Sequence, residues 1–272
     1  MNFLYRTLVT IIGIPLLVYI FFGPKILFYI FCAILSLASF VEIGNIIGMK
    51  GKNTNFILYS FLLVGMYCTV YKLGFNYVFP FLIIFTYLVF FQMLYSNDKE
   101  LYMNHALYMV CVTYVFLFPF FLVKIRENSM GSHLILFLFV TIWSVDIMAY
   151  LGGCSIGGPK LAPTISPKKT IAGFVSGIVG AVLVWTVYCW APLGAKPLIK
   201  LFSNMQLFMI SFAISLISQL GDLFESRFKR IFKIKDSSNI IPGHGGILDR
   251  FDSVIFTAPL YHSLIFYISG GF

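Results

Sequence analysis

Nine long apolar runs divide the chain and leave room for one general kind of fold. They cover approximately residues 7–22, 26–48, 56–72, 75–95, 105–123, 133–152, 171–191, 204–220 and 254–270. A helix needs about 20 apolar residues to cross the hydrocarbon core of a bilayer. Only 11% of the 272 residues are charged, against about 25% in soluble domains. The sequence therefore predicts an all-α, polytopic integral membrane protein with about nine transmembrane helices.

Lysine and arginine residues set the expected orientation, because the loops that carry more of them stay in the cytoplasm. With nine spans, 13 of the 19 cations fall on the side of the N-terminus and six on the other side. This predicts a cytoplasmic N-terminus and places both long polar loops, 153–170 and 221–253, in the cytoplasm. We expect residues 1–130 to form N-terminal transmembrane helices and residues 131–272 to form a C-terminal transmembrane region that carries these loops.

The second of these loops contains a polar island, Asp222 to Asp252. It holds 11 of the 29 charged residues of the chain, five of them carboxylates and six of them cations. Placing charged groups beside a bilayer costs free energy, so a cluster this dense is expected to have a function. Carboxylates suit a metal ion and cations suit phosphates, so the island predicts a site for an anionic substrate.

Spacing within the island suggests how its groups meet. A helix that continues past Asp222 would place Glu225, Ser226 and Lys229 on one face, three, four and seven residues further on. This arrangement is either a ledge for a metal ion and phosphates or an ordinary helix end with local ion pairs. Spacing alone does not decide between the two.

The end of the island adds a histidine and two more carboxylates. His244 lies among glycines in residues 242–246, where the backbone can approach an anion closely; the alternative is a tight turn with an incidental histidine. Asp249 and Asp252 can share one face of a helix. Mg²⁺ is usually held by one or two carboxylates together with substrate phosphates, so one Asp from each flanking helix would suffice.

The first polar loop and the run before it hold further candidates. Asp146 lies about 21 Å along its helix at 1.5 Å per residue, and an ionisable group at such a depth is a functional candidate. Three prolines stiffen residues 159–170, whose phosphate-binding groups are Ser166, Lys168, Lys169 and Thr170. Taken alone, SPKKT is better interpreted as a basic loop beside the membrane. Glu42 is either a wall of the site or a carboxylate that extends to the interface, and we expect the latter.

The order of residues in the island carries a specific resemblance. It runs from Ser226–Arg230 to Lys235–Asp236, then to PGHGG at 242–246 and finally to Asp249–Asp252. This pattern resembles the signature of the phosphatidate cytidylyltransferases, also called CDP-diacylglycerol synthases. Asp146-x-x-Ala-Tyr and the LAPTISPKKT run are similar to that family too, whereas the first 130 residues match it only in being hydrophobic.

Three positions depart from the family pattern. Ala172-Gly173 stands where the family commonly has Glu-Gly, Gly153 stands where a basic residue is frequent, and Ile147 stands where Thr is usual. These departures concern the surroundings of loop 153–170. They do not affect the carboxylates and cations of the island.

The resemblance implies a nucleotidyltransferase of phospholipid biosynthesis. It would transfer CMP from CTP to phosphatidic acid, giving CDP-diacylglycerol and pyrophosphate, with Mg²⁺ as cofactor and with or without a monovalent cation beside it. It would be a homodimer among the lipids of a bacterial inner membrane, its active site facing the cytoplasm, and we expect no nucleic-acid partner.

The resemblance and the spacing together suggest roles for residues of this chain. The resemblance implies that Asp222 and Asp249 hold the metal ion, and the spacing adds Glu225 and Asp252 as candidate ligands. The catalytic groups would be Asp222, Asp249, Lys229 and His244. The groups around the substrates would be Ser166, Lys168, Lys169, Thr170, Ser226, Arg230, Lys235, Arg250 and Asp146.

Two other kinds of protein compete with this interpretation. A CTP-dependent polyprenol kinase, or another lipid transferase that uses CTP, would need the same nucleotide, but the intact signature disfavours the kinase. A transporter of phosphorylated solutes would need its ionisable residues near the middle of the bilayer, at a repeat interface. Here these residues gather at one cytoplasmic rim, which disfavours transport.

Overall fold

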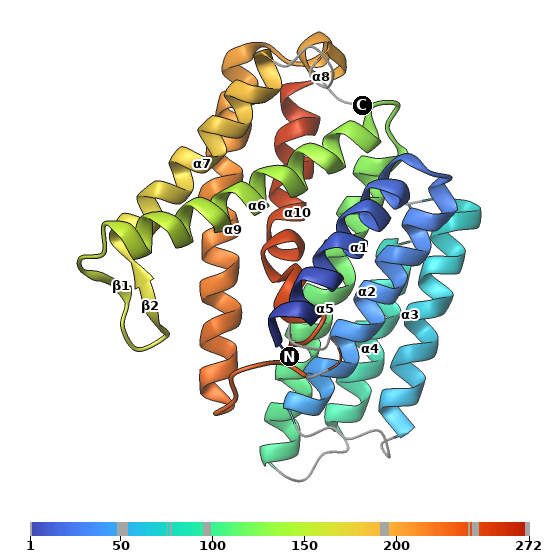
Figure 1. Cartoon of the computed structure of the whole chain (residues 1–272). Helices are drawn as coiled ribbons and strands as arrows, with labels where there is room; N and C mark the ends of the chain where they lie inside the picture. Colours follow the sequence, from blue (N-terminus) through green and yellow to red (C-terminus); the bar gives the residue numbers. More distant parts are fainter. Residues whose placement is uncertain are drawn as a thin grey trace.

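The computed structural model describes residues 2–47, 54–74, 76, 78–94, 99–190, 196–238, 240 and 245–269. In these residues the chain forms ten α-helices and one small hairpin (Figure 1). The helices are α1 (Asn2–Phe22), α2 (Lys25–Ile46), α3 (Thr54–Leu73), α4 (Val78–Leu94), α5 (Lys99–Glu127), α6 (Gly131–Ser155), α7 (Ile171–Trp190), α8 (Lys196–Leu201), α9 (Asn204–Ile231) and α10 (Leu248–Ile268). The strands are β1 (Lys160–Ala162) and β2 (Ser166–Thr170).

Each of the nine predicted apolar runs coincides with a helix. Among the described residues, five helices are long and apolar enough to cross a membrane: α2, α6, α7, α9 and α10. Shorter apolar helical stretches lie at Thr10–Phe22 and Leu82–Phe91. The protein is therefore an all-α membrane protein, with one two-stranded sheet as its β structure in the part of the chain described.

Figure 1 shows how the helices are arranged. Helices α2, α3, α4 and α5 lie side by side, and α10 packs between α5 and α9. Helix α6 crosses obliquely in front of α9 and α10, and α7 packs against both α6 and α9. The start of α1, the hairpin and the end of α9 lie toward the same end of the bundle. Buried aromatic side chains fill the core that joins the two halves, among them Phe28, Phe40, Phe120, Phe139 and Tyr261.

Glycines allow α6 and α7 to approach closely. A Cβ atom on Gly173 would lie 2.7 Å from the carbonyl oxygen of Ala149 and 3.3 Å from the Cα of Gly153. A Cβ atom on Gly153 would lie 3.2 Å from Oγ1 of Thr170. Small residues let helix backbones pack at short range in membranes. Gly153, which departs from the family pattern, therefore lies where α6 and α7 pack closely against each other.

The sequence analysis did not predict the hairpin or the short helix α8. It treated residues 159–170 as a proline-stiffened loop. The strands are antiparallel and irregular, with Lys160 opposite Thr170 and Ala162 opposite Ser166. The amide of Ile171 donates to the carbonyl of Pro159 and closes the base of the hairpin. The lysines of this segment therefore lie on a hairpin whose base is fixed at the start of α7.

Candidate functional site

A cavity of about 290 Å³ lies where α6, α9 and α10 meet, and acidic side chains dominate it. The chain has only ten Asp and Glu residues in all. Six of them line this acidic cavity: Asp146 from α6, Asp222 and Glu225 from α9, Asp236 from the following loop, and Asp249 and Asp252 from α10. The cations that line it are Lys229 and Arg250.

Lys229 joins the two helices that carry most of these carboxylates. Its Nζ lies 2.7 Å from Oε2 of Glu225, one turn back on α9, and 2.7 Å from Oδ1 of Asp249 on α10. Helix α9 continues to Ile231 and so includes the first part of the polar loop that was expected at 221–253; Glu225 and Lys229 follow Asp222 on this helix. The side chains that form these ion pairs therefore also line the charged cavity.

Asp249 is held by the backbone as well as by Lys229. Its Oδ2 accepts hydrogen bonds from the amides of Ser237 and Gly246, both at 2.9 Å. Gly245 has φ of +84°, and a Cβ there would lie 2.6 Å from Oδ2 of Asp249. The glycine pair of the signature thus lets the loop wrap closely around this carboxylate.

The charge balance of the acidic cavity fits a divalent cation. Six carboxylates and two cations line it; Lys229 is already paired with two of the six, and Lys169 of the hairpin is paired with a third, Asp222. Oε1 of Glu225 is buried and has no hydrogen-bond partner among the described residues. Among the described residues, no three metal-ligating side chains are close enough to hold an ion by themselves. Oxygen donors in excess of cations, without a closed cage, suit Mg²⁺ that shares its coordination with substrate phosphates.

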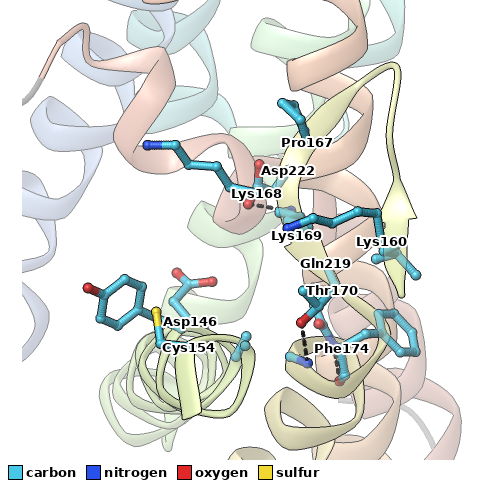
Figure 2. Close-up of a pocket in the computed structure, with 15 residues that line it drawn as sticks. Asp146, Cys154, Lys160, Pro167, Lys168, Lys169, Thr170, Phe174, Gln219 and Asp222 are labelled. Atoms are coloured by element: carbon cyan, nitrogen blue, oxygen red, sulfur yellow. Dashed lines mark hydrogen bonds and ion pairs between the residues drawn. The ribbon is translucent and has the colours of Figure 1, made fainter. Parts of the chain in front are cut away.

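A second cavity, of about 550 Å³, adjoins the first (Figure 2). It lies between α6, the hairpin and the start of α7, and Asp146 and Asp222 line both cavities. Figure 2 shows Lys169 reaching Asp222, with 2.6 Å between Nζ and Oδ2. Three lysines and mostly apolar side chains line this larger cavity, including Lys160, Lys168, Lys169, Tyr150, Leu161 and Phe174.

The structure brings most of the predicted site residues to these two cavities. Those that line one or both are Asp146, Lys168, Lys169, Thr170, Asp222, Glu225, Lys229, Asp249, Arg250 and Asp252. Ser166, Ser226, Arg230 and Lys235 line neither of them. His244 lies outside the described residues.

Three of the predicted residues form hydrogen bonds that hold other parts of the site in place. Thr170 accepts a hydrogen bond from the amide of Gly173 and so caps the first turn of α7. Ser226 donates to Oδ1 of Asp222. Arg230 donates to the carbonyl of Ile165 in the hairpin, which ties the hairpin to the end of α9.

The sequence analysis missed other residues. Lys160, Gln219 and Asp236 line the cavities. Lys160 and Gln219 lie outside the motif, and Asp236 lies within it but was given no role at the site. The prediction that Glu42 extends to the interface is wrong, because Glu42 is fully buried and accepts hydrogen bonds from the loop before α10. Its position inside an apolar run was the available signal, since carboxylates at such depth usually have a function.

Comparison with known proteins places this arrangement in a family. Residues 4–268 match the profile of the cytidylyltransferase family. A phosphatidate cytidylyltransferase of Rickettsia bellii is 49% identical over 149 residues, which is 55% of this chain and 63% of that protein. Those of Staphylococcus epidermidis and Staphylococcus aureus are 42% and 41% identical over 172 residues, 62% of each chain. These matches span less than two thirds of each relative. The chain belongs to the cytidylyltransferase family.

Proposed function

We propose that the protein is a phosphatidate cytidylyltransferase that transfers CMP from CTP to phosphatidic acid, with Mg²⁺ as cofactor. The observation that carries this proposal is the acidic cavity of six carboxylates beside a cavity that three lysines line. The family match and the names of the relatives support it.

The electrostatics of this reaction account for such a site. A phosphate oxygen of phosphatidic acid attacks the α-phosphorus of CTP, a new P–O bond forms, and the bond to the leaving pyrophosphate breaks. The attacking phosphate is already an anion at neutral pH, so a general base is not the main need. Two like unit charges about 4 Å apart repel by roughly 4 kcal/mol at an effective dielectric near 20. Bound Mg²⁺ would supply neutralising charge at the phosphates, and Asp222, Glu225, Asp249 and Asp252 would hold it.

The two cavities suit different substrates. The acidic cavity suits the metal ion and the triphosphate of CTP. The larger cavity combines lysines with apolar walls, and the neighbouring Ile147, Tyr150 and Leu151 are exposed apolar side chains of a membrane helix. Such a surface suits the phosphate and glycerol of a lipid. In this arrangement the attacking oxygen meets the α-phosphorus near Asp146 and Asp222, which line both cavities.

A substitution at Lys168 tests which cavity binds which substrate. Replacing it with alanine is expected to raise the KM for phosphatidic acid about fivefold, since one exposed charged contact contributes up to about 1 kcal/mol. The KM for CTP is expected to stay within twofold. Steady-state rates with each substrate varied in turn measure both constants. Lys72→Ala, at an exposed lysine on α3, is the matched control. An increase confined to the KM for CTP would contradict this assignment of the cavities.

The orientation and assembly belong to the same proposal. We propose that the nine apolar runs are nine spans. The excess of lysine and arginine on one side then predicts a cytoplasmic N-terminus and an active site that faces the cytoplasm of a bacterial cell. A homodimer and a monovalent cation beside Mg²⁺ complete it. A cysteine placed at position 168 in a cysteine-free chain should react with an impermeant thiol reagent only in inverted vesicles. Labelling in intact cells would contradict this orientation.

The position of the label in CTP tests the reaction itself. Membranes containing the protein, phosphatidic acid and Mg²⁺ should incorporate label from [α-³²P]CTP into CDP-diacylglycerol and should release label from [γ-³²P]CTP as pyrophosphate. A lipid kinase would transfer the γ-label to its lipid instead. Absence of labelled CDP-diacylglycerol from folded protein would overturn the proposal.

A further inference from the structure

Glu42 on α2 is buried, and its carboxylate accepts four hydrogen bonds from a distant part of the chain. Oε2 accepts from the hydroxyl of Ser237 at 2.7 Å and from the amide of Leu248 at 2.9 Å. Oε1 accepts from the hydroxyl of Ser238 at 2.7 Å and from the amide of Ile247 at 2.8 Å. All four donors lie in the loop before α10 or at the first residue of that helix.

These contacts make Glu42 the cap of α10. The first amides of a helix have no partner within the helix, and a carboxylate near them is favourable. Ile247 occupies the N-cap position and provides no side-chain cap. The cap comes instead from a residue 205 positions earlier. In the described residues no cation pairs with Glu42, so these donors and the helix terminus compensate its charge.

Ser237 connects this cap to the acidic cavity. Its hydroxyl donates to Glu42, while its amide donates to Asp249. Gly246 lies between the same groups, and its amide donates to Asp249. A Cβ atom on Gly246 would lie 1.9 Å from the hydroxyl of Ser237 and 2.5 Å from Oε2 of Glu42. Asp249 in turn contacts Lys229. A continuous chain of hydrogen bonds thus runs from α2 to the cavity.

We propose that Glu42 is a positioning residue of the transferase site. It does not line either cavity. It fixes the start of α10 and the loop around Asp249, and through Asp249 it fixes Lys229 and Glu225. By this contact the N-terminal helices take part in catalysis, although none of their described side chains lines the acidic cavity. The catalytic part of this inference rests on the proposed function.

Glu42→Gln tests the proposal with little change in shape. A carboxamide places an NH₂ group against donors, so a backbone amide at the start of α10 loses its acceptor. We expect kcat to fall about 10- to 100-fold, as for partners that orient a metal site, with the KM values of both substrates within about threefold. Ser237→Ala, which removes one hydroxyl, should lower kcat in the same direction.

Ser36→Ala is the matched control, because Ser36 is a fully buried residue of α2 that hydrogen-bonds Tyr67 instead. Rates are expressed per folded molecule. Hydrogen exchange provides a second measurement that needs no activity: Glu42→Gln should speed exchange of the amides at 246–250, and Ser36→Ala should not. If the wild-type protein has no transferase activity, the proposed function fails while exchange still tests the cap. Unchanged exchange, unchanged kcat in Glu42→Gln and Ser237→Ala, or an equal loss of kcat in Ser36→Ala would overturn the proposal.

Discussion

Asp222→Asn is expected to lower kcat for CDP-diacylglycerol formation at least about 100-fold in a protein that remains folded. Asp222 lines both cavities, pairs with Lys169 at 2.6 Å and accepts from Ser226. Loss of a residue that merely orients a metal ligand reduces affinity or activity 10- to 100-fold, and a direct ligand should matter at least as much. Initial rates measured against Mg²⁺ concentration should also show a higher requirement for the metal.

The control for this substitution is Glu127→Gln. Glu127 is a carboxylate at the end of α5, where it accepts a hydrogen bond from Tyr29 and pairs with Lys124. It lies outside both cavities, so its variant should retain wild-type rates. An Asp222→Asn protein within about threefold of the wild type would remove this residue from the metal site.

Lys229→Met should reduce both activity and stability. The side chains of Glu225 and Asp249 are only 4% and 5% exposed, and Lys229 contacts both. Removing one member of a buried ion pair costs about 3–5 kcal/mol, because a buried charge is left without compensation. We expect the free energy of unfolding to fall by about that amount and product formation to fall at least about 100-fold. Denaturant titration in detergent and initial rates measure the two effects.

The double variant Lys229→Met/Glu225→Gln separates these effects. Neutralising Glu225 removes one of the two uncompensated carboxylates, so much of the lost stability should return. Activity should not return, because the cation beside Asp249 is still missing. If the single variant unfolds at the denaturant concentration of the wild type, the two ion pairs do not carry the stability assigned to them.

The helices could be predicted because hydrophobic runs are a local property of the sequence. All nine runs coincide with helices, but α9 continues to Ile231, into the segment 221–253 that was expected to be a loop. The hairpin at 160–170 could not be predicted in this way. An isolated two-stranded hairpin is marginal, and this one is supported by Arg230 of α9 at the carbonyl of Ile165, a contact across 65 positions.

The site shows the same division between local and distant contacts. The pairing of Glu225 with Lys229 follows from their spacing on one helix. The contact of Lys229 with Asp249 depends on how α9 packs against α10, which no spacing reveals. The interface prediction for Glu42 failed for this reason, since its hydrogen-bond donors come from the loop before α10 and from the start of that helix, 195 to 206 positions away.

Binding of Mn²⁺ to the purified protein, measured by electron paramagnetic resonance, tests most directly the claim that the acidic cavity gathers a metal ion with the phosphates of CTP. Mn²⁺ takes oxygen ligands in octahedral geometry as Mg²⁺ does. The wild-type protein should bind Mn²⁺ in competition with Mg²⁺, and more tightly when CTP is present. A folded Asp222→Asn/Asp252→Asn variant should bind it at least about tenfold more weakly. Equal affinity in that variant would contradict the account.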